Sequence, residues 1–239
     1  MTGIAALLLT GGTTVHSRFG VPLELDEEST SSLPVQSDRA AVLRDASVVV
    51  LDEATMGNRK LFAVVDRVLK DIMRGVDESL GDVLFGGKIM VLSGDWRQLP
   101  PVVRHAGRAG TVTSCLKYAQ MWQNFTVLTL TTNMRVETLG RGTAEAEEVH
   151  SFSEWLLDVG AGLDDKVEIP DNMKINANDL ASLVQHAFPQ LENESVVKDG
   201  CILTTLNKYV DDMNAFVLQD MHGLERIYKS ADYFGPVHY

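Results

Sequence analysis

SVVVLDEATMG, residues 47–57, places a run of β-branched and aliphatic residues directly before two adjacent carboxylates, Asp52 and Glu53. Such a short apolar run predicts a strand buried on both faces, as in a parallel sheet. Paired acids at the tip of a buried strand are typical of a nucleotide site, in which one acid binds a metal ion and the other orients a water. A site of that kind normally includes a glycine-rich phosphate loop ending in Gly-Lys-Ser/Thr.

Three further runs rich in Val, Ile, Leu and Thr also predict strands: KIMVLSGD (88–95), FTVLTLTTN (125–133) and GCILTTLN (200–207). Between the first two strands, apolar residues at helical spacing predict a helix over residues 58–73, with Asn58 as its N-cap. Two more helices are expected at 114–123 and 146–162, the second ended by glycines. The alternation predicts an α/β fold with right-handed crossovers and a site at the carboxyl ends of its strands.

Composition narrows the function classes. The chain has 239 residues, of which 45% are hydrophobic and 23% charged, so it has enough apolar residues to bury a core. Cys115 and Cys201 stand far apart, so neither a disulfide framework nor a zinc site is implied. No apolar run approaches the length of a membrane span. The net charge of -12 argues against a protein that coats nucleic acid, although it leaves room for a local basic groove.

Three strand tips carry polar residues of complementary kinds. The first ends in Asp52-Glu53, the second runs into a loop containing Gln98, and the third is followed by Arg135. A carboxylate for a metal ion, a carboxylate and an amide around a water, and a guanidinium for phosphate charge suit phosphoryl transfer to water. Each residue alone has a plainer explanation: a solvated turn, a loop amide and a surface cation. Their occurrence at successive strand tips favours a site for phosphoryl transfer.

Five segments, read in order, resemble the consecutive motifs of superfamily-one DNA helicases of the Pif (petite integration frequency) family. The spacing and the flanking SFSEWLLDVGAG and EIPDNM are most similar to the branch found in Helitron transposons. The resemblance covers almost the whole chain. Its segments are TGIAALLLTGGTTVHSRFGVPLELDEEST (2–30), VVVLDEATM (48–56), FGGKIMVLSGDWRQLPPVV (85–103), LTLTTNMRV (128–136) and CILTTLNKYVDDMNAFVL (201–218).

The resemblance implies a role for each matching residue of the nucleotide site. Asp52 would hold Mg²⁺ and Glu53 would activate the water that attacks ATP. Gln98 would sense the γ-phosphate, and Arg135 would contact it from within the same chain. Trp96 and Thr55 stand where the family usually has Phe and Pro, and neither touches the proposed chemistry.

A second set of residues matches the family's motif for single-stranded DNA. Thr14 and Ser17 would bind phosphates, and His16 or Phe19 would stack on a base. Packing in the core is the alternative for Phe19, and a buried, hydrogen-bonded imidazole is the alternative for His16. The acidic segment at about residues 20–38 falls where the family has a small strand-separating wedge.

The large departure from the family is the absence of a phosphate loop from this sequence. The only Gly-Lys pair, Gly87-Lys88, is followed by Ile89 and leads into a strand, so it predicts a turn. We therefore expect residues 1–170 to form a RecA-like motor lobe without its first strand and Walker A loop. Residues 171–239 would form a linker and the beginning of a second RecA-like lobe, without the family's later motifs.

Two classes of function follow. One is an ATP-dependent DNA helicase that moves 5′ to 3′ on single strands and opens forks, in repair, recombination, telomere maintenance or transposition, in the nucleus or mitochondrion. The other is an inactive transposon-derived remnant, or at most a weak single-strand-binding module. ATP as substrate, Mg²⁺ as cofactor and DNA as partner belong to the first class. An unpaired strand edge leads us to expect an oligomeric or poorly soluble chain, although the sequence does not set the number of subunits.

Overall fold

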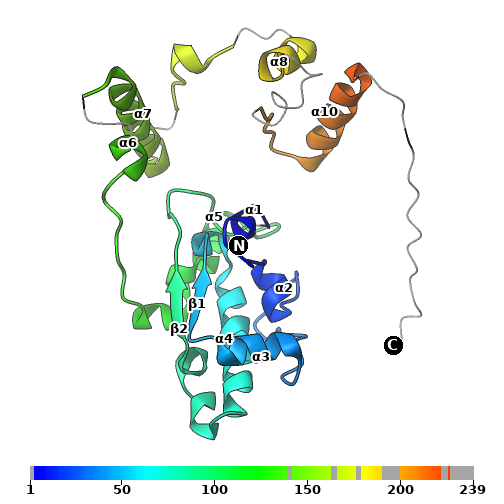
Figure 1. The fold of residues 1–239 in the computed structure, drawn as a ribbon, viewed down its shortest axis with the longest axis vertical. Coiled ribbons are helices and arrows are strands. Elements are labelled where there is room, and N and C mark those ends of the chain that lie inside the picture. The colour runs from blue at the N-terminus through cyan, green and yellow to red at the C-terminus, as the bar shows by residue number, and fades with distance from the viewer. Residues whose placement is uncertain are drawn as a thin grey trace. The chain divides into compact units, whose positions relative to one another are not determined.

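Two short parallel strands form the single sheet in the part of the chain that the structure, a computed structural model, describes. Strand β1 (Val48–Leu51) pairs with β2 (Ile89–Leu92) in a register that sets Val48 opposite Ile89 and Leu51 opposite Leu92. Helix α4 (Arg59–Arg74) connects the two strands (Figure 1). The described residues are 3–138, 142–162, 166–175, 179–189, 200–221 and 226. The parallel pair confirms the α/β fold class.

Helix α4 forms as its sequence predicts. The Asn58 side chain accepts a hydrogen bond from the Lys60 backbone N–H at 3.0 Å, which satisfies one of the free donors at the helix start. Its apolar stripe is almost completely buried and supplies the centre of the core, namely Leu61, Phe62, Val64, Val65, Val68, Leu69, Ile72 and Met73. Since full burial of one such side chain contributes roughly 1.5–3 kcal/mol, this helix dominates the stability of the unit.

Within the described residues of the first unit, the sheet is covered on one face only, which corrects the expectation of burial on both faces. Val49 and Leu51 point into the core, whereas Val48 and Val50 are 47% and 50% exposed. On β2, Ile89 and Val91 are also exposed. Successive side chains of a strand alternate between faces, and among the described residues only one face receives a packed helix.

The predicted strand at 125–133 does not form. Within it Val127, Leu128 and Leu130 are 63%, 87% and 98% exposed, and the segment has no regular secondary structure. The described residues of the predicted strand at 200–207 are irregular up to the start of helix α10 (Asn207–Asp220). Apolar β-branched sequence favours a strand only where a neighbouring strand offers its free N–H and C=O groups. No described strand does so here.

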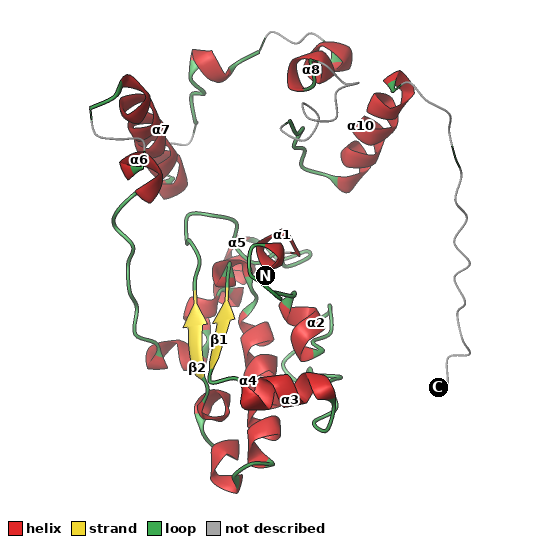
Figure 2. Cartoon of the chain, in the orientation of Figure 1, coloured by secondary structure: helices red, strands yellow, loops and turns green. Residues whose placement is uncertain are grey.

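Short helices make up most of the remaining regular structure (Figure 2). The predicted helix at 114–123 is replaced by two 3₁₀ turns, Leu116–Tyr118 and Gln120–Asn124. The predicted helix at 146–162 is present as α7 (Ala144–Ala161), ended by Gly162 in the left-handed conformation. The other helices of residues 3–162 are α1 (Gly3–Leu7), α2 (Val15–Phe19), α3 (Asp38–Asp45), α5 (Arg108–Ser114) and α6 (Met134–Glu137), with 3₁₀ turns at Ala54–Met56, Glu78–Gly81 and Leu84–Gly87.

The chain divides into two units, Met1–Asp165 and Lys166–Tyr239, close to the predicted boundary after residue 170. The described part of the second unit contains a 3₁₀ turn at Asp171–Met173, helix α8 (Leu180–Ala187) and α10. Residues 190–199 and most of 222–239, which belong to the predicted second lobe, lie outside the described residues. None of the described helices is long and apolar enough to cross a bilayer.

The irregular segment between α2 and α3, predicted as a wedge-like loop, is fastened to α4. The Arg67 guanidinium donates to the carbonyl oxygens of Ser29 (2.6 Å) and Glu27 (3.0 Å). At the base of the loop, the Ser32 N–H donates to the Gly20 carbonyl at 2.9 Å. The loop is therefore held in place at both its tip and its base.

The bare face of the sheet predicts self-association. We expect residues 1–239 to form oligomers in solution, because four neighbouring apolar side chains stand in water. Val50 and Val91 are partners in the strand register, so the double change Val50→Thr/Val91→Thr replaces two of the four apolar side chains by polar ones and keeps β-branched residues. The variant is expected to shift the species toward monomer in sedimentation analysis.

Val49→Thr is the matched control, because the same change then lies on the covered face. Burying a hydroxyl without a partner costs about 1–3 kcal/mol, so this variant should lower the free energy of unfolding and leave association unchanged. A wild-type chain that is monomeric with one sharp melting transition would contradict the expectation.

Candidate functional site

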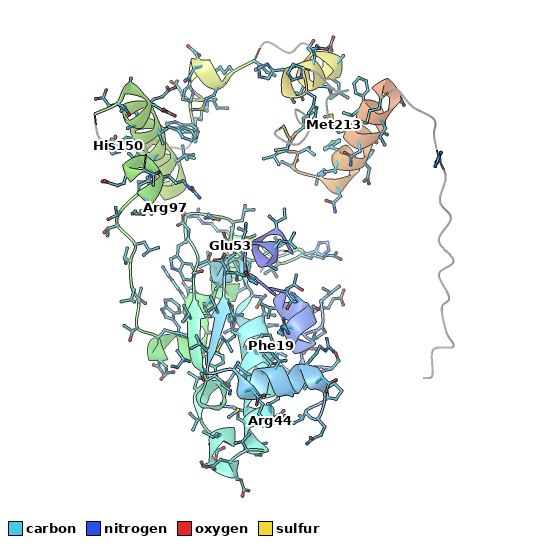
Figure 3. All side chains as sticks on the ribbon, in the orientation of Figure 1. Phe19, Arg44, Glu53, Arg97, His150 and Met213 are labelled. Atoms are coloured by element: carbon cyan, nitrogen blue, oxygen red, sulfur yellow. The ribbon has the colours of Figure 1, made fainter. Side chains whose placement is uncertain are left out.

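The two acids lie at the carboxyl end of β1, where the chain turns sharply. Glu53 adopts φ 55° and ψ 36°, the left-handed region that a side chain with a Cβ rarely occupies. This conformation costs on the order of 1–2 kcal/mol. The Ala54 N–H donates to the Ser93 carbonyl at 2.8 Å, so the turn is tied to the end of β2. Figure 3 labels Glu53 at this tip and Arg97 beyond the end of β2.

Asp52 is oriented by two donors. The Ser93 hydroxyl donates to Asp52 Oδ1 at 2.5 Å, and the Glu53 backbone N–H donates to the same oxygen at 3.0 Å. Charge-assisted bonds of this kind fix a carboxylate more firmly than bonds between neutral groups do. The half-buried Asp52 is therefore held by the tips of both strands.

Glu53 is positioned differently. Its Oε2 atom is buried, and no described residue donates a hydrogen bond to it. Burial of a carboxylate oxygen that receives no hydrogen bond from the protein is costly. Backbone strain and an unsatisfied buried oxygen at one residue are typical of a site at which a further group binds.

The loop after β2 packs tightly against the loop after β1. A Cβ on Gly94 would lie 2.8 Å from Thr55 Oγ1 and 3.1 Å from Thr55 N, so only glycine fits there. The Thr55 hydroxyl donates to the Asp95 carbonyl at 3.1 Å. Thr55 therefore holds the loop after β2 against the turn after β1. That this departure from the family leaves the chemistry untouched stays a prediction.

Gln98 follows directly in this loop. Its backbone N–H donates to the Asp95 carbonyl at 3.2 Å, and its side chain is exposed. It lines an open pocket of about 390 Å³ together with Met56, Arg97, Leu99 and Pro100. The structure thus brings Gln98 into the loop that is hydrogen-bonded to the turn of Asp52 and Glu53.

Arg135 is not positioned by the sheet. It lies exposed on α6, where Asn133 Oδ1 accepts a hydrogen bond from its backbone N–H at 3.1 Å. Because residues 125–133 do not pair with β1 or β2, the expected third strand tip does not exist among the described residues. The expectation that three successive strand tips converge is corrected to two.

The predicted DNA segment forms helix α2. Thr14 is its N-cap, with Oγ1 accepting from the Ser17 N–H at 3.3 Å. Phe19 is 1% exposed and belongs to the core, so the packing alternative holds, and the prediction that its ring stacks on a base is corrected. Ser17 is exposed and His16 is half-buried, and partial burial lowers the pKa of His16. A DNA contact by His16, Thr14 or Ser17 stays a prediction.

Ser93 is the functional residue that sequence reasoning missed. It directly follows β2 and precedes Gly94, and a hydroxyl at a strand tip opposite an acid pair is the available signal. Its partner in space lies far away in sequence, so only the parallel register reveals the bond to Asp52.

The described residues contain no group of three or more His, Cys, Asp or Glu side chains arranged to hold a metal ion. Mg²⁺ in nucleotide sites is commonly bound by one or two carboxylates, with water and phosphate oxygens as the other ligands. The single oriented carboxylate of Asp52 fits that pattern. A transition-metal site with several protein ligands does not fit the described residues.

The fold and the site define a class, an α/β lobe with a nucleotide-type acid pair at the carboxyl edge of a parallel sheet. A family model of PIF1-like helicases matches residues 1–169, and the chain belongs to this family. An ATP-dependent DNA helicase PIF1 of Danio rerio is 25% identical over 242 residues, which cover 97% of this chain and 31% of that protein. The ATP-dependent DNA helicase RRM3 of Saccharomyces cerevisiae is 30% identical over 124 residues, which cover 51% of this chain and 16% of that protein.

Solved structures show the same fold. The Pif1 helicase from Bacteroides in complex with ADP-AlF3 and single-stranded DNA gives a TM-score of 0.60 at 20% identity, covering 93% of this chain and 47% of that one. The Pif1 helicase from Candida albicans gives 0.55 at 21% identity, covering 93% and 43%. The chain spans less than a third of the two curated relatives and just under half of the two structures.

A substitution at Gly94 tests the packing of the two loops. We expect Gly94→Ala to lower the free energy of unfolding by about 1–3 kcal/mol, because the added Cβ meets Thr55. Thermal or urea unfolding measures the change. Gly107→Ala is the control, since nothing lies within 4 Å of a Cβ there. Adding Thr55→Ala to Gly94→Ala should recover part of the loss, and a strictly additive double variant would show that the clash is absent.

Substitutions in α2 distinguish packing in the core from contact with DNA. Phe19→Ala is expected to cost about 3–5 kcal/mol of stability, as for other buried aromatic residues. His16→Ala should cost much less, because the imidazole is half-exposed, so any loss of DNA affinity in that variant reports contact. Urea unfolding and oligonucleotide anisotropy measure the two effects. Stability unchanged by Phe19→Ala would show that the ring lies outside the core.

Proposed function

We propose that this chain is the central part of an ATP-driven motor that moves on single-stranded DNA and opens forked DNA. Family membership supports the class of activity, and Glu53 carries the argument for the chemistry. A strained backbone and a buried oxygen that no described residue satisfies are the features of a group poised to accept a proton from a bound water. Relatives named as ATP-dependent DNA helicases agree with this assignment.

In this proposal Glu53 orients and deprotonates the water that attacks the γ-phosphate. Gln98 contributes the amide that contacts the γ-phosphate or the water, from the loop that Thr55 fastens. Asp52 keeps its carboxylate directed by the Ser93 hydroxyl. Arg135, which the sheet does not hold at the paired tips, would supply positive charge to the γ-phosphate.

Mg²⁺ would be held by Asp52 and would neutralise phosphate charge when bound. The finer assignments rest on the sequence resemblance alone. They are the Helitron-like branch, 5′ to 3′ polarity, a role in transposition, repair, recombination or telomere maintenance, and a place in the nucleus or mitochondrion. The later residues 171–239 would begin the second motor lobe.

An inactive remnant is the second candidate, and the only Gly-Lys pair of residues 1–239 bears on it. Lys88, which follows the only Gly-Lys pair, donates through Nζ to the Arg44 carbonyl at 2.5 Å and leads into β2. Burial lowers the pKa of Lys88, with the charge of Asp45 opposing that effect. This lysine secures the end of α3 and is not a phosphate ligand, so residues 1–239 contain no lysine in a phosphate loop.

Hydrolysis decides between the two candidates. In a full-length version that adds a Gly-x-x-x-x-Gly-Lys-Ser/Thr loop and the family's later motifs to residues 1–239, DNA-stimulated ATP hydrolysis is expected. Glu53→Gln should slow it by about 10²–10⁴-fold, the usual contribution of a general base, and leave nucleotide binding within a few-fold. Glu24→Gln, at an exposed acid of the 20–38 loop, is the matched control.

Residues 1–239 alone are expected to show no hydrolysis above background. Turnover by that chain that disappears with Glu53→Gln would overturn this expectation. A loop-bearing chain that binds ATP and never hydrolyses it would favour the inactive remnant.

A further inference from the structure

The charges of this chain are unevenly distributed along its sequence. The protein carries 33 Asp and Glu residues, yet none occurs between Asp95 and Glu137. The same stretch contains five exposed cations and four large aromatic residues. They are Arg97, Arg104, Arg108, Lys117 and Arg135, and Trp96, Tyr118, Trp122 and Phe125. Basic residues interleaved with aromatic ones favour nucleic acid, because phosphates need cations and bases need flat apolar faces.

Within this stretch one cation and one aromatic ring are in contact. Lys117 Nζ lies 4.3 Å from the centroid of the Trp96 ring, and Trp96 is 40% exposed. Tyr118, next to the lysine, is 54% exposed. An ammonium group above an accessible indole occupies the position that a stacked base would take.

The pair is supported from below by half-buried and buried groups. The Trp122 ring meets Trp96 edge-on, with centroids 5.7 Å apart and planes at 90°. Leu116, beside the lysine, is 1% exposed and packs in the core. Cys115 forms an antiparallel bridge with Asn58, the N-cap of α4. Because both partners stand on fixed backbone, the surface exists before any ligand arrives, which lowers the entropy lost on binding.

We propose that Trp96 and Lys117 form a binding site for one nucleotide of single-stranded DNA, an assignment that rests on the proposed function and adds residues to it. The indole stacks on the base, and the ammonium moves to the adjacent phosphate. Arg97, the next residue after Trp96, supplies a second exposed cation.

Replacing the Lys117 ammonium by a base above the Trp96 indole is favourable. An exposed cation–π contact is worth about a factor of 2 to 5 in equilibrium constant. A base stacked on an aromatic side chain is worth about a factor of 5 to 150. Lys117 meanwhile gains a phosphate partner. Stacking needs an unpaired base, so single strands are bound in preference to duplex.

Helix α2, the segment that the sequence favours for DNA, offers less. Phe19 is buried, and Thr14 caps the helix. The Arg18 guanidinium donates to Thr13 Oγ1 and to the Gly11 carbonyl, each at 3.1 Å. Its cation is thus engaged within the chain, whereas the side chains of residues 96–136 present exposed charge and rings.

The test is binding of a labelled oligothymidine to residues 1–239 by anisotropy over a range of salt, with tryptophan fluorescence read in parallel. Trp96→Leu should weaken binding by about 5- to 150-fold and remove the fluorescence quench. Trp96→Phe should keep most of the affinity, because a ring remains. Lys117→Gln should weaken binding by about 3- to 10-fold and reduce the salt slope by about 0.7, while Lys117→Arg restores both.

Arg74→Gln is the matched control. It removes one exposed cation at the last residue of α4. The helix is about 24 Å long at 1.5 Å per residue, and its other end is the one bridged to Cys115, so Arg74 lies far from Lys117. Its affinity and salt slope should equal those of wild type. Circular dichroism melts of every variant establish that the chain is folded.

The possible outcomes distinguish failure of the Trp96–Lys117 site from failure of the proposed function. If wild type binds the oligothymidine and the Trp96 and Lys117 variants bind equally well, the site assignment is wrong and the proposed function stands. If ADP quenches Trp96 and the variants lose ADP but not DNA, the pair belongs to the nucleotide and the assignment is also wrong. If wild type does not bind even at low salt, the assignment fails, and ATP hydrolysis by the loop-bearing chain still decides the proposed function.

Discussion

The packing of α4 on the paired strands β1 and β2 is the constraint on which the rest of the structure depends. Its apolar stripe supplies the core, and its buried Asp66 also sets the course of β2. Asp66 accepts from the Phe85 backbone N–H at 2.6 Å and pairs with Lys70 at 2.8 Å. Phe85 has φ 53° in the turn before the strand, so the carboxylate holds a conformation that would otherwise be unfavourable. One helix thus fixes the start of β2 and, through Asn58, the end of the turn after β1.

The same constraint explains why a strained site can persist. Glu53 combines a left-handed backbone with a buried oxygen that no described group satisfies. Both features reduce stability, and they are tolerated because Ser93, Thr55 and Gly94 connect the two loops closely on either side. Strain held by a rigid surrounding is a usual property of catalytic positions, where a relaxed residue would lose its orientation.

Charge is partitioned in a way that suits a partner with a phosphate backbone. The 20–38 loop is acidic, and the side chain of Arg59 pairs with Glu27 at 3.2 Å, which adds to the clamp made by Arg67. Residues 96–136, in contrast, contain no Asp or Glu and carry five cations. A net charge of -12 therefore says little about either surface, because nucleic acid responds to local potential and not to the sum over the chain.

The sequence by itself determined the parts that depend on local pattern. Helical spacing and a capping residue predicted α4, and apolar runs before an acid pair and before Gly94 predicted β1, β2 and their polar tips. Tertiary structure decided what depends on distant partners: the strand at 125–133 does not form, Phe19 is buried, and Arg135 stays outside the paired tips. Strand pairing, burial and the bond between Ser93 and Asp52 are contacts between residues far apart in sequence, and local periodicity carries no information about them.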